Sequence, residues 1–271
     1  MPPQSATQKS AIAQFVSITG TTDRTATKYL KATGYKLHEA VDTYFQSGNS
    51  TSSGQNKELQ LNKLFDSLRN DAEDQNDALS ADSSLRYLQT IGVDLEGASL
   101  FLALELVQAP SIGEITREGF VNGWKVTPAD AKLESQKQHF KRLVDSLGND
   151  RDLFRKAYRY AFVVGKEADQ RALSLENALV YWELLFREPG QPWIGHALGV
   201  DWLDEWTGFL REKWTRSVSR DMWNQTFEFA LKSMADEALD FWSEDGAWPG
   251  VIDDFVAWYR RKAASEMDVD A

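Results

Sequence analysis

The sequence has 271 residues, enough for one or two domains, and its 42% hydrophobic and 12% aromatic content is typical of a globular protein. It contains no cysteine, which excludes disulfides, thiolate metal sites and cysteine nucleophiles. The formal net charge of −11 argues against nucleic-acid binding and favours partners with basic surfaces.

The chain shows no targeting or membrane signal. Its longest apolar runs, such as LFLAL at residues 100–104, are far shorter than the roughly 20 residues of a membrane helix. The N-terminal segment lacks the apolar stretch and cleavage site of a secretory signal. The three histidines, His38, His139 and His196, are too far apart in sequence to indicate a metal site. We therefore expect a protein of the cytoplasm and nucleus with no cofactor and no membrane partner.

The first predicted unit, residues 8–46, contains three short helices. Apolar residues recur at helical spacing in residues 9–18, TGTTD breaks that helix, and a second helix covers residues 23–33. The third has apolar residues at i, i+3, i+4 and i+7: Leu37, Ala40, Val41, Tyr44 and Phe45. A core this small rarely holds an enzyme site.

A composition break, SGNSTSSGQNK over residues 47–57, predicts a linker because it is rich in Ser, Gly and Asn and has no apolar residue. From residue 58 onward the pattern is helical, and no run alternates as a strand would. The predicted helices cover residues 58–69, 83–91, 97–107, 117–124, 128–147, 150–164, 175–186, 201–214, 220–240 and 250–262. We therefore expect an all-α protein, with about ten helices in a larger domain over residues 58–263 and a disordered acidic tail over residues 264–271.

The stretch NDAEDQNDALSAD, residues 70–82, is similar to a calcium-binding EF-hand loop in its alternating acids. Counted from Asp71, however, Asn76 replaces the glycine of the sharp turn and Asp82 replaces the bidentate glutamate. We expect an EF-hand shape without the ion. Its partner would be residues 113–124, with Ile115 in the pairing strand and Phe120 at the start of the exit helix. A calcium-binding protein is the alternative.

The adjacent acids Asp253 and Asp254 raise the alternative of a helical glycosidase, which places two carboxylates about 5–10 Å apart across a cleft. Neighbouring residues on a helix point about 100° apart, so these two cannot flank one bond. No catalytic residue is predicted.

Two late helices each begin with an acid close to a tryptophan. In the first, Ser219 is the predicted N-cap and Asp221 lies in the first turn. In the second, Pro249 starts the helix, Asp253 lies off the buried stripe, and the stripe itself is formed by Ile252, Phe255, Val256 and Tyr259. Stabilisation by the helix dipole alone would explain acids at these positions, and recognition by a basic partner is the alternative.

The segments RDMWNQTFEF (220–229), DGAWPGVIDDFV (245–256) and ENALVYWELLF (176–186) resemble signature segments of the defective-in-cullin-neddylation family. The resemblance covers residues 58–263, and residues 8–46 are similar to the ubiquitin-associated-like domain that many members carry. It implies a large domain of two EF-hand-like lobes that bind no calcium. It also implies a non-enzymatic, scaffold-type ligase component that binds a cullin C-terminal region and the charged Nedd-type conjugating enzyme, and so promotes cullin neddylation.

The resemblance also implies site residues. The family's cullin-binding patch is matched here by Asp221, Ala247 and Asp253. The family holds the N-terminal residues of the conjugating enzyme, often with an acetylated methionine, in an apolar pocket. The matching wall here is Leu100, Ala103, Leu104, Val107 and Ile115, for which plain core packing is the alternative.

Ubiquitin or modifier binding by the N-terminal unit stays open. ITGTT at residues 18–22 stands where ubiquitin-associated domains usually have a Met-Gly-Phe/Tyr loop. A ubiquitin-binding shuttle or adaptor is therefore the alternative function.

Overall fold

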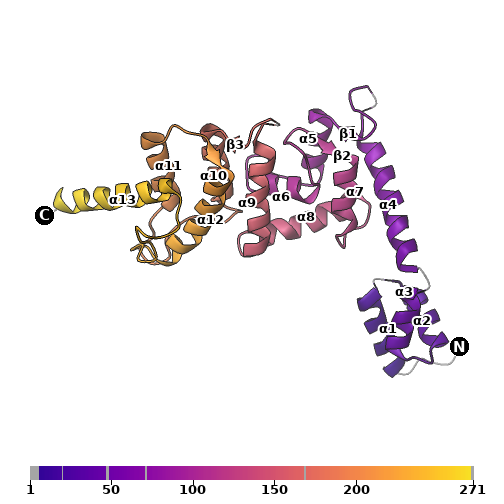
Figure 1. Cartoon of the computed structure of the whole chain (residues 1–271). Helices are drawn as coiled ribbons and strands as arrows, with labels where there is room; N and C mark the ends of the chain where they lie inside the picture. The colour runs from indigo at the N-terminus through magenta and orange to yellow at the C-terminus, as the bar shows by residue number, and fades with distance from the viewer. Residues whose placement is uncertain (1–5, 20, 47–48, 71, 168, 270–271) are drawn as a thin grey trace. The chain divides into compact units, whose positions relative to one another are not determined.

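The computed structural model of the chain (Figure 1) describes every residue except 1–5, 20, 47–48, 71, 168 and 270–271. Within these limits the protein is mostly helical, as predicted, with thirteen α-helices and four strands of two residues each. It divides into two compact units, Met1–Lys63 and Leu64–Ala271. No helix in the described part is long and apolar enough to cross a membrane.

The N-terminal unit contains the three predicted helices, α1 (Ala6–Thr19), α2 (Asp23–Ala32) and α3 (Leu37–Gln46). The Thr22 side chain caps α2 by accepting a hydrogen bond from the Thr25 amide. The core of this unit is formed by Ile12, Phe15, Ala26, Leu30, Ala40 and Tyr44. These few apolar side chains, contributed by all three helices, hold the cluster together.

The helix α4 (Asn49–Leu68) runs through the boundary between the units and includes most of the predicted linker. Residues 49–57 are helical although their composition indicated a loop, and residues 47–48 lie outside the described part. Serine and glycine lower helix propensity by only about 0.5–1 kcal/mol each, so a helix can continue through them. The connection between the two units is therefore largely helical.

The first lobe follows α4 and comprises β1 (Ala78–Leu79), α5 (Ala81–Thr90), α6 (Ser99–Leu106), β2 (Ile115–Thr116) and α7 (Arg117–Lys125). The two strands pair antiparallel with Leu79 opposite Ile115, which confirms the predicted position of Ile115. Phe120 is buried in the first turns of α7, and its ring lies 5.5 Å from that of Phe65 and 5.3 Å from that of Tyr87.

Two longer helices come next, α8 (Leu133–Leu147), which begins later than predicted, and α9 (Arg151–Gly165). Asp150 caps α9, since its carboxylate accepts hydrogen bonds from the amides of Asp152 and Leu153. The helix α9 contacts α6 of the first lobe and also α10 (Leu175–Leu185) and α12 (Arg220–Ala235) of the second. Its central place in Figure 1 reflects this role as the element shared by the two lobes.

The second lobe repeats the plan of the first. Between α9 and α12 lie β3 (Ala172–Leu173), α10, α11 (Trp202–Lys213) and β4 (Val218–Ser219), and β3 pairs antiparallel with β4. At its centre the buried Tyr158 hydroxyl accepts a hydrogen bond from Trp182 Nε1 at 2.8 Å and donates one to the Trp223 carbonyl at 2.7 Å. Burial raises the pKa of the Tyr158 phenol well above its ordinary value, so this network stays neutral.

The C-terminal part differs from the prediction at two helix ends. The helix α12 ends at Ala235 instead of residue 240, because Asp236 adopts an extended backbone conformation. The last helix, α13 (Gly250–Val269), includes residues 264–269, which were predicted as a disordered tail. Alanine, glutamate and methionine in this stretch are good helix formers, which favours its continuation. Residues 270–271 lie outside the described part.

Candidate functional site

The start of α12 is fixed by buried aromatic contacts and presents Asp221 to solvent. Ser219 is the N-cap, as predicted, with its hydroxyl accepting a hydrogen bond from the Met222 amide at 3.1 Å. Trp223 is fully buried, and its Nε1 donates a hydrogen bond to the Tyr158 carbonyl at 2.9 Å. Its ring stacks on that of Trp182, with 5.1 Å between the ring centres. Asp221 is exposed two residues before this anchor.

The start of α13 is fixed in a different way. Its first amides find an acceptor in Pro249, whose carbonyl accepts a hydrogen bond from the Ile252 amide at 2.8 Å. Three residues of the predicted stripe are buried, namely Ile252, Phe255 and Val256. The fourth, Tyr259, is half-buried, and its ring centre lies 4.8 Å from that of Trp202. Asp253 therefore lies on a helix that cannot rotate without breaking its core.

The Asp253 carboxylate is oriented by a tryptophan that the sequence motif did not identify. Trp242 Nε1 donates a hydrogen bond to Asp253 Oδ1 at 2.9 Å, and the Arg260 guanidinium lies over the Trp242 ring at 5.0 Å. Asp253 is half-buried, and its Oδ2 makes no hydrogen bond or ion pair with a described residue. Asp254, the next residue, is exposed, and its side chain has no hydrogen bond or ion pair with any residue that the structure describes. The two acids are thus not equivalent.

Ala247 is exposed beside an anchored tryptophan. The Trp248 ring packs against those of Phe229 and Phe241, with 5.7 Å and 6.0 Å between ring centres. Lys232 Nζ lies 5.8 Å from the centre of the Trp248 ring. A larger side chain in place of Ala247 would project into solvent and not into the core of this chain.

Aromatic packing links the segments that carry these predicted site residues. Phe229 on α12 contacts Trp248 and also Phe255 of α13, both at 5.7 Å between ring centres. Across the described residues, no hydrogen bond or ion pair joins Asp221, Ala247 and Asp253 directly to one another. The segments of α12 and α13 are therefore braced by a shared core, with Asp221 exposed and Asp253 half-buried.

The predicted pocket for the conjugating enzyme is closed in this structure. Leu100 is 7% exposed and the other four predicted wall residues, Ala103, Leu104, Val107 and Ile115, are fully buried. They lie on α6, at its C-terminal end and in β2, within the core of the first lobe.

The loop that resembles an EF-hand uses its acid internally. Asp74 accepts hydrogen bonds from the backbone amides of Asn70 and Ser80, both at 2.8 Å. Burial would raise the pKa of this carboxyl, but the hydrogen bonds outweigh it and hold the pKa well below its ordinary value. Asp71 lies outside the described part, and the residues inside it contain no group of three or more possible metal ligands.

The exposed face of α3 in the N-terminal unit is polar, with His38, Glu39, Asp42 and Thr43 pointing to solvent. Among the side chains described in this unit up to residue 44, only one large apolar side chain is substantially exposed, that of Ile18 at 54%. The described part of this surface offers little of the apolar patch that ubiquitin binding requires.

Comparisons with known proteins agree with this architecture. Residues 135–258 match a family model described as cullin binding, and residues 9–51 match one described as a UBA-like domain. The chain is 44% identical to defective in cullin neddylation protein 1 of Pyricularia oryzae, over 99% of this chain and 100% of the relative. It is also 31% identical to the protein of that name from Yarrowia lipolytica, over 92% of this chain and 95% of the relative.

Proposed function

Because the chain belongs to the defective-in-cullin-neddylation family, we propose that Asp221, Ala247 and Asp253 form the surface with which it binds cullin. The protein is a non-catalytic scaffold that promotes cullin neddylation. A scaffold of this kind lowers the barrier by holding two reactants in a productive orientation. The absence of cysteine is consistent with this, since the thioester belongs to the conjugating enzyme.

One observation carries the proposal for the surface. Trp242 Nε1 donates a hydrogen bond to one oxygen of the Asp253 carboxylate, and Asp253 is only half-buried. A carboxylate that is oriented before binding loses less conformational freedom when it pairs with a basic group, so more of the interaction energy contributes to affinity. A helix dipole explains why an acid is tolerated here, but it does not explain why one acid is oriented and its neighbour is not.

The test compares Asp253→Lys with Asp254→Lys, which make the same charge change in the same helical turn. We expect Asp253→Lys to weaken binding of a cullin C-terminal fragment by about 100-fold or more, since like charges then face each other across the interface. Asp254→Lys should keep binding within about threefold of wild type, as expected for a peripheral charge. Calorimetry measures both affinities, and circular dichroism verifies the fold. Equal losses in the two variants would refute this assignment of Asp253.

We also propose that the apolar set Leu100, Ala103, Leu104, Val107 and Ile115 receives the N-terminal residue of the Nedd-type conjugating enzyme. The resemblance of residues 58–263 to the family supports this, and the closed core implies that α6 and β2 separate slightly on binding. An apolar pocket favours an acetylated N-terminus, because a charged amine would lose hydration there. Peptides with free and acetylated N-termini, titrated into the full chain, test the idea, and equal affinity would contradict it.

We place this activity in the cytoplasm and nucleus, which the family resemblance supports and imaging of the tagged full chain can test. Binding of ubiquitin or the modifier through the N-terminal unit is the weaker proposal, because the exposed face of α3 is polar over residues 37–44. Titration of the full chain with each of these two proteins decides it.

A further inference from the structure

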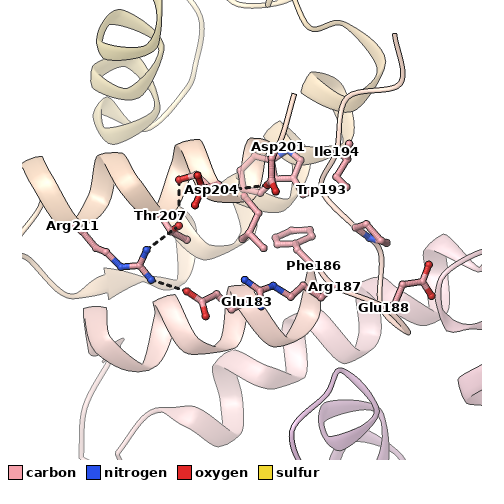
Figure 2. Close-up of a pocket in the computed structure, with 12 residues that line it drawn as sticks. Glu183, Phe186, Arg187, Glu188, Trp193, Ile194, Asp201, Asp204, Thr207 and Arg211 are labelled. Atoms are coloured by element: carbon pink, nitrogen blue, oxygen red, sulfur yellow. Dashed lines mark hydrogen bonds and ion pairs between the residues drawn. The ribbon is translucent and has the colours of Figure 1, made fainter. Parts of the chain in front are cut away.

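A cavity of about 290 Å³ lies in the second lobe between α10, α11 and the segment that joins them (Figure 2). Its floor is apolar, since Phe186, Trp193 and Leu203 are buried beneath it. The volume is at the small end of ligand pockets, which begin near roughly 300 Å³, and suits one or two side chains of a polypeptide.

The rim of this cavity carries unneutralised carboxylates. Four acids and two arginines line it, and one of each is already paired, with Glu183 Oε1 lying 2.6 Å from Arg211 Nη2. Asp201 caps α11 by accepting a hydrogen bond from the Asp204 amide at 3.0 Å (Figure 2). The side chains of Asp204 and Glu188 make no hydrogen bond or ion pair with any described residue, and both are exposed. The rim therefore has a net negative charge, and the carboxylates of Asp204 and Glu188 can accept hydrogen bonds from a ligand.

The cavity is also rigid. Trp193 Nε1 donates to the Ser233 hydroxyl at 2.8 Å, which fixes the floor. The loop over residues 195–200 is fastened by the Glu237 carboxylate, which accepts hydrogen bonds from the amides of Ala197, Leu198 and Val200 at 2.6, 2.7 and 3.1 Å. A preformed cavity costs less to order when a partner binds.

We propose that this cavity is a second contact site for cullin, and that it receives a lysine or arginine side chain flanked by an apolar residue. The aromatic floor suits the aliphatic stem of such a side chain, and its cationic end can lie over an aromatic ring or pair with a rim carboxylate. The inference rests on the proposed cullin-binding function and extends it to a second site.

Cullin is the fitting partner because the cavity and the proposed surface share one aromatic cluster. The ring centre of Trp193, on the cavity floor, lies 6.3 Å from that of Phe229. The ring centre of Phe229 in turn lies 5.7 Å from that of Trp248, the residue next to Ala247. A stable interface uses about 20–30 residues on each side, which is far more than a patch of three. A cullin surface basic enough to pair with Asp221 and Asp253 also matches the net negative charge of the cavity rim.

The first experiment measures binding of a cullin C-terminal fragment to full-length Asp204→Lys and Glu176→Lys. Glu176 is an exposed acid on α10 that does not line the cavity, so both variants change the net charge equally. We expect about tenfold weaker binding for Asp204→Lys and wild-type binding for Glu176→Lys, as for loss of a specific charge contact. Loss confined to Asp253→Lys, with both of these unchanged, would overturn the cavity site and leave the proposed function standing. Unchanged binding in Asp253→Lys contradicts the proposed surface instead.

The second experiment does not depend on affinity. Because the chain contains no cysteine, Asp204→Cys and Glu176→Cys each provide one thiol for a maleimide photo-crosslinker. We expect the Asp204→Cys probe to crosslink to the cullin fragment and the Glu176→Cys probe to do so at background level. Crosslinking of the Asp204→Cys probe to a second copy of this chain, or no crosslink to cullin while cullin remains bound, would overturn the proposal.

Discussion

The two lobes begin their last strand-to-helix turn with the same chemistry and use it differently. The first lobe has TRE at residues 116–118 and the second has SRD at residues 219–221, so each has a capping hydroxyl, an arginine and an acid in the first helical turn. Thr116 accepts a hydrogen bond from the Gly119 amide and Ser219 accepts one from the Met222 amide, both at 3.1 Å. Local sequence therefore gives both helices the same start.

The difference lies in what faces the arginine. In the first lobe, Arg117 pairs with Asp66 at 2.6 Å and Asp77 at 2.8 Å, and its guanidinium lies 4.6 Å from the centre of the Phe65 ring. In the second, Arg220 is exposed, and its side chain has no hydrogen bond or ion pair with the residues described. The arginine of the first lobe is thus used in internal contacts, whereas that of the second lobe is not. An acid in the first turn of a helix therefore does not by itself indicate a binding site.

The largest expected effect separates the two acids of these turns. Asp221→Lys should weaken cullin binding by about 100-fold or more, because it reverses a charge in the proposed surface. Glu118→Lys makes the same change at the equivalent position of the first lobe and should leave binding within about threefold of wild type. Calorimetric titration with a cullin C-terminal fragment measures both. If the acids served only the helix dipole, the two variants would bind cullin alike.

The two arginines should separate in stability. Arg117→Ala removes two ion pairs, a hydrogen bond to the Asn76 carbonyl and an aromatic contact, and should lower the free energy of unfolding by about 1–3 kcal/mol. Arg220→Ala should change it by less than about 0.5 kcal/mol, as for an ordinary surface residue. Urea unfolding followed by circular dichroism provides the comparison. A larger loss for Arg220→Ala would show that the second turn is structural as well.

The sequence predicted every helix of this comparison but not the contacts that distinguish the lobes. Helical periodicity located α7 and α12, and capping chemistry identified Ser219, because both depend on residues close together in the chain. The pairing of Ile115 was predictable from the resemblance of the loop to an EF-hand, whereas the strand pair β3–β4 was missed because two residues cannot show an alternating pattern.

Contacts made by irregular segments were beyond the sequence. Trp242 follows the end of α12 and is separated from Asp253 by 11 positions, in a stretch where Leu239 has a φ of 59°. No periodic rule relates the two residues, so their hydrogen bond depends on a loop conformation that tertiary packing selects. The helical character of residues 49–57 was missed for a related reason, since composition reports propensity and not the neighbouring helix that extends into the segment.

A smaller effect is expected at this tryptophan. Trp242→Phe removes the N–H that orients Asp253 and keeps an aromatic ring, so cullin affinity should fall by about three- to tenfold, the value of one hydrogen bond. Trp258→Phe removes a similar donor, which lies 3.1 Å from Glu212 and outside the proposed surface, and should leave affinity unchanged. Surface plasmon resonance resolves such differences. Equal affinities for the two variants would mean that Asp253 does not need its orienting partner.

The smallest expected effect concerns the loops that precede the paired strands and appears only in acid. Hydrogen bonds outweigh burial at Asp74 and hold the pKa of its carboxyl well below the ordinary value in the folded first lobe. The unfolded chain therefore takes up this proton first, near the ordinary aspartate value of about 3.9, and the stability that Asp74 contributes above that pH is lost as the pH falls below it. The stability difference between wild type and Asp74→Asn should consequently narrow between about pH 5 and pH 3 in urea unfolding. In the corresponding loop of the second lobe, the side chain of the exposed Asp169 makes no hydrogen bond with a described residue, so Asp169→Asn should change the free energy of unfolding by less than about 0.5 kcal/mol at neutral pH. If the stability difference between wild type and Asp74→Asn stays constant with pH, the hydrogen bonds to Asp74 do not distinguish the charged from the neutral carboxyl.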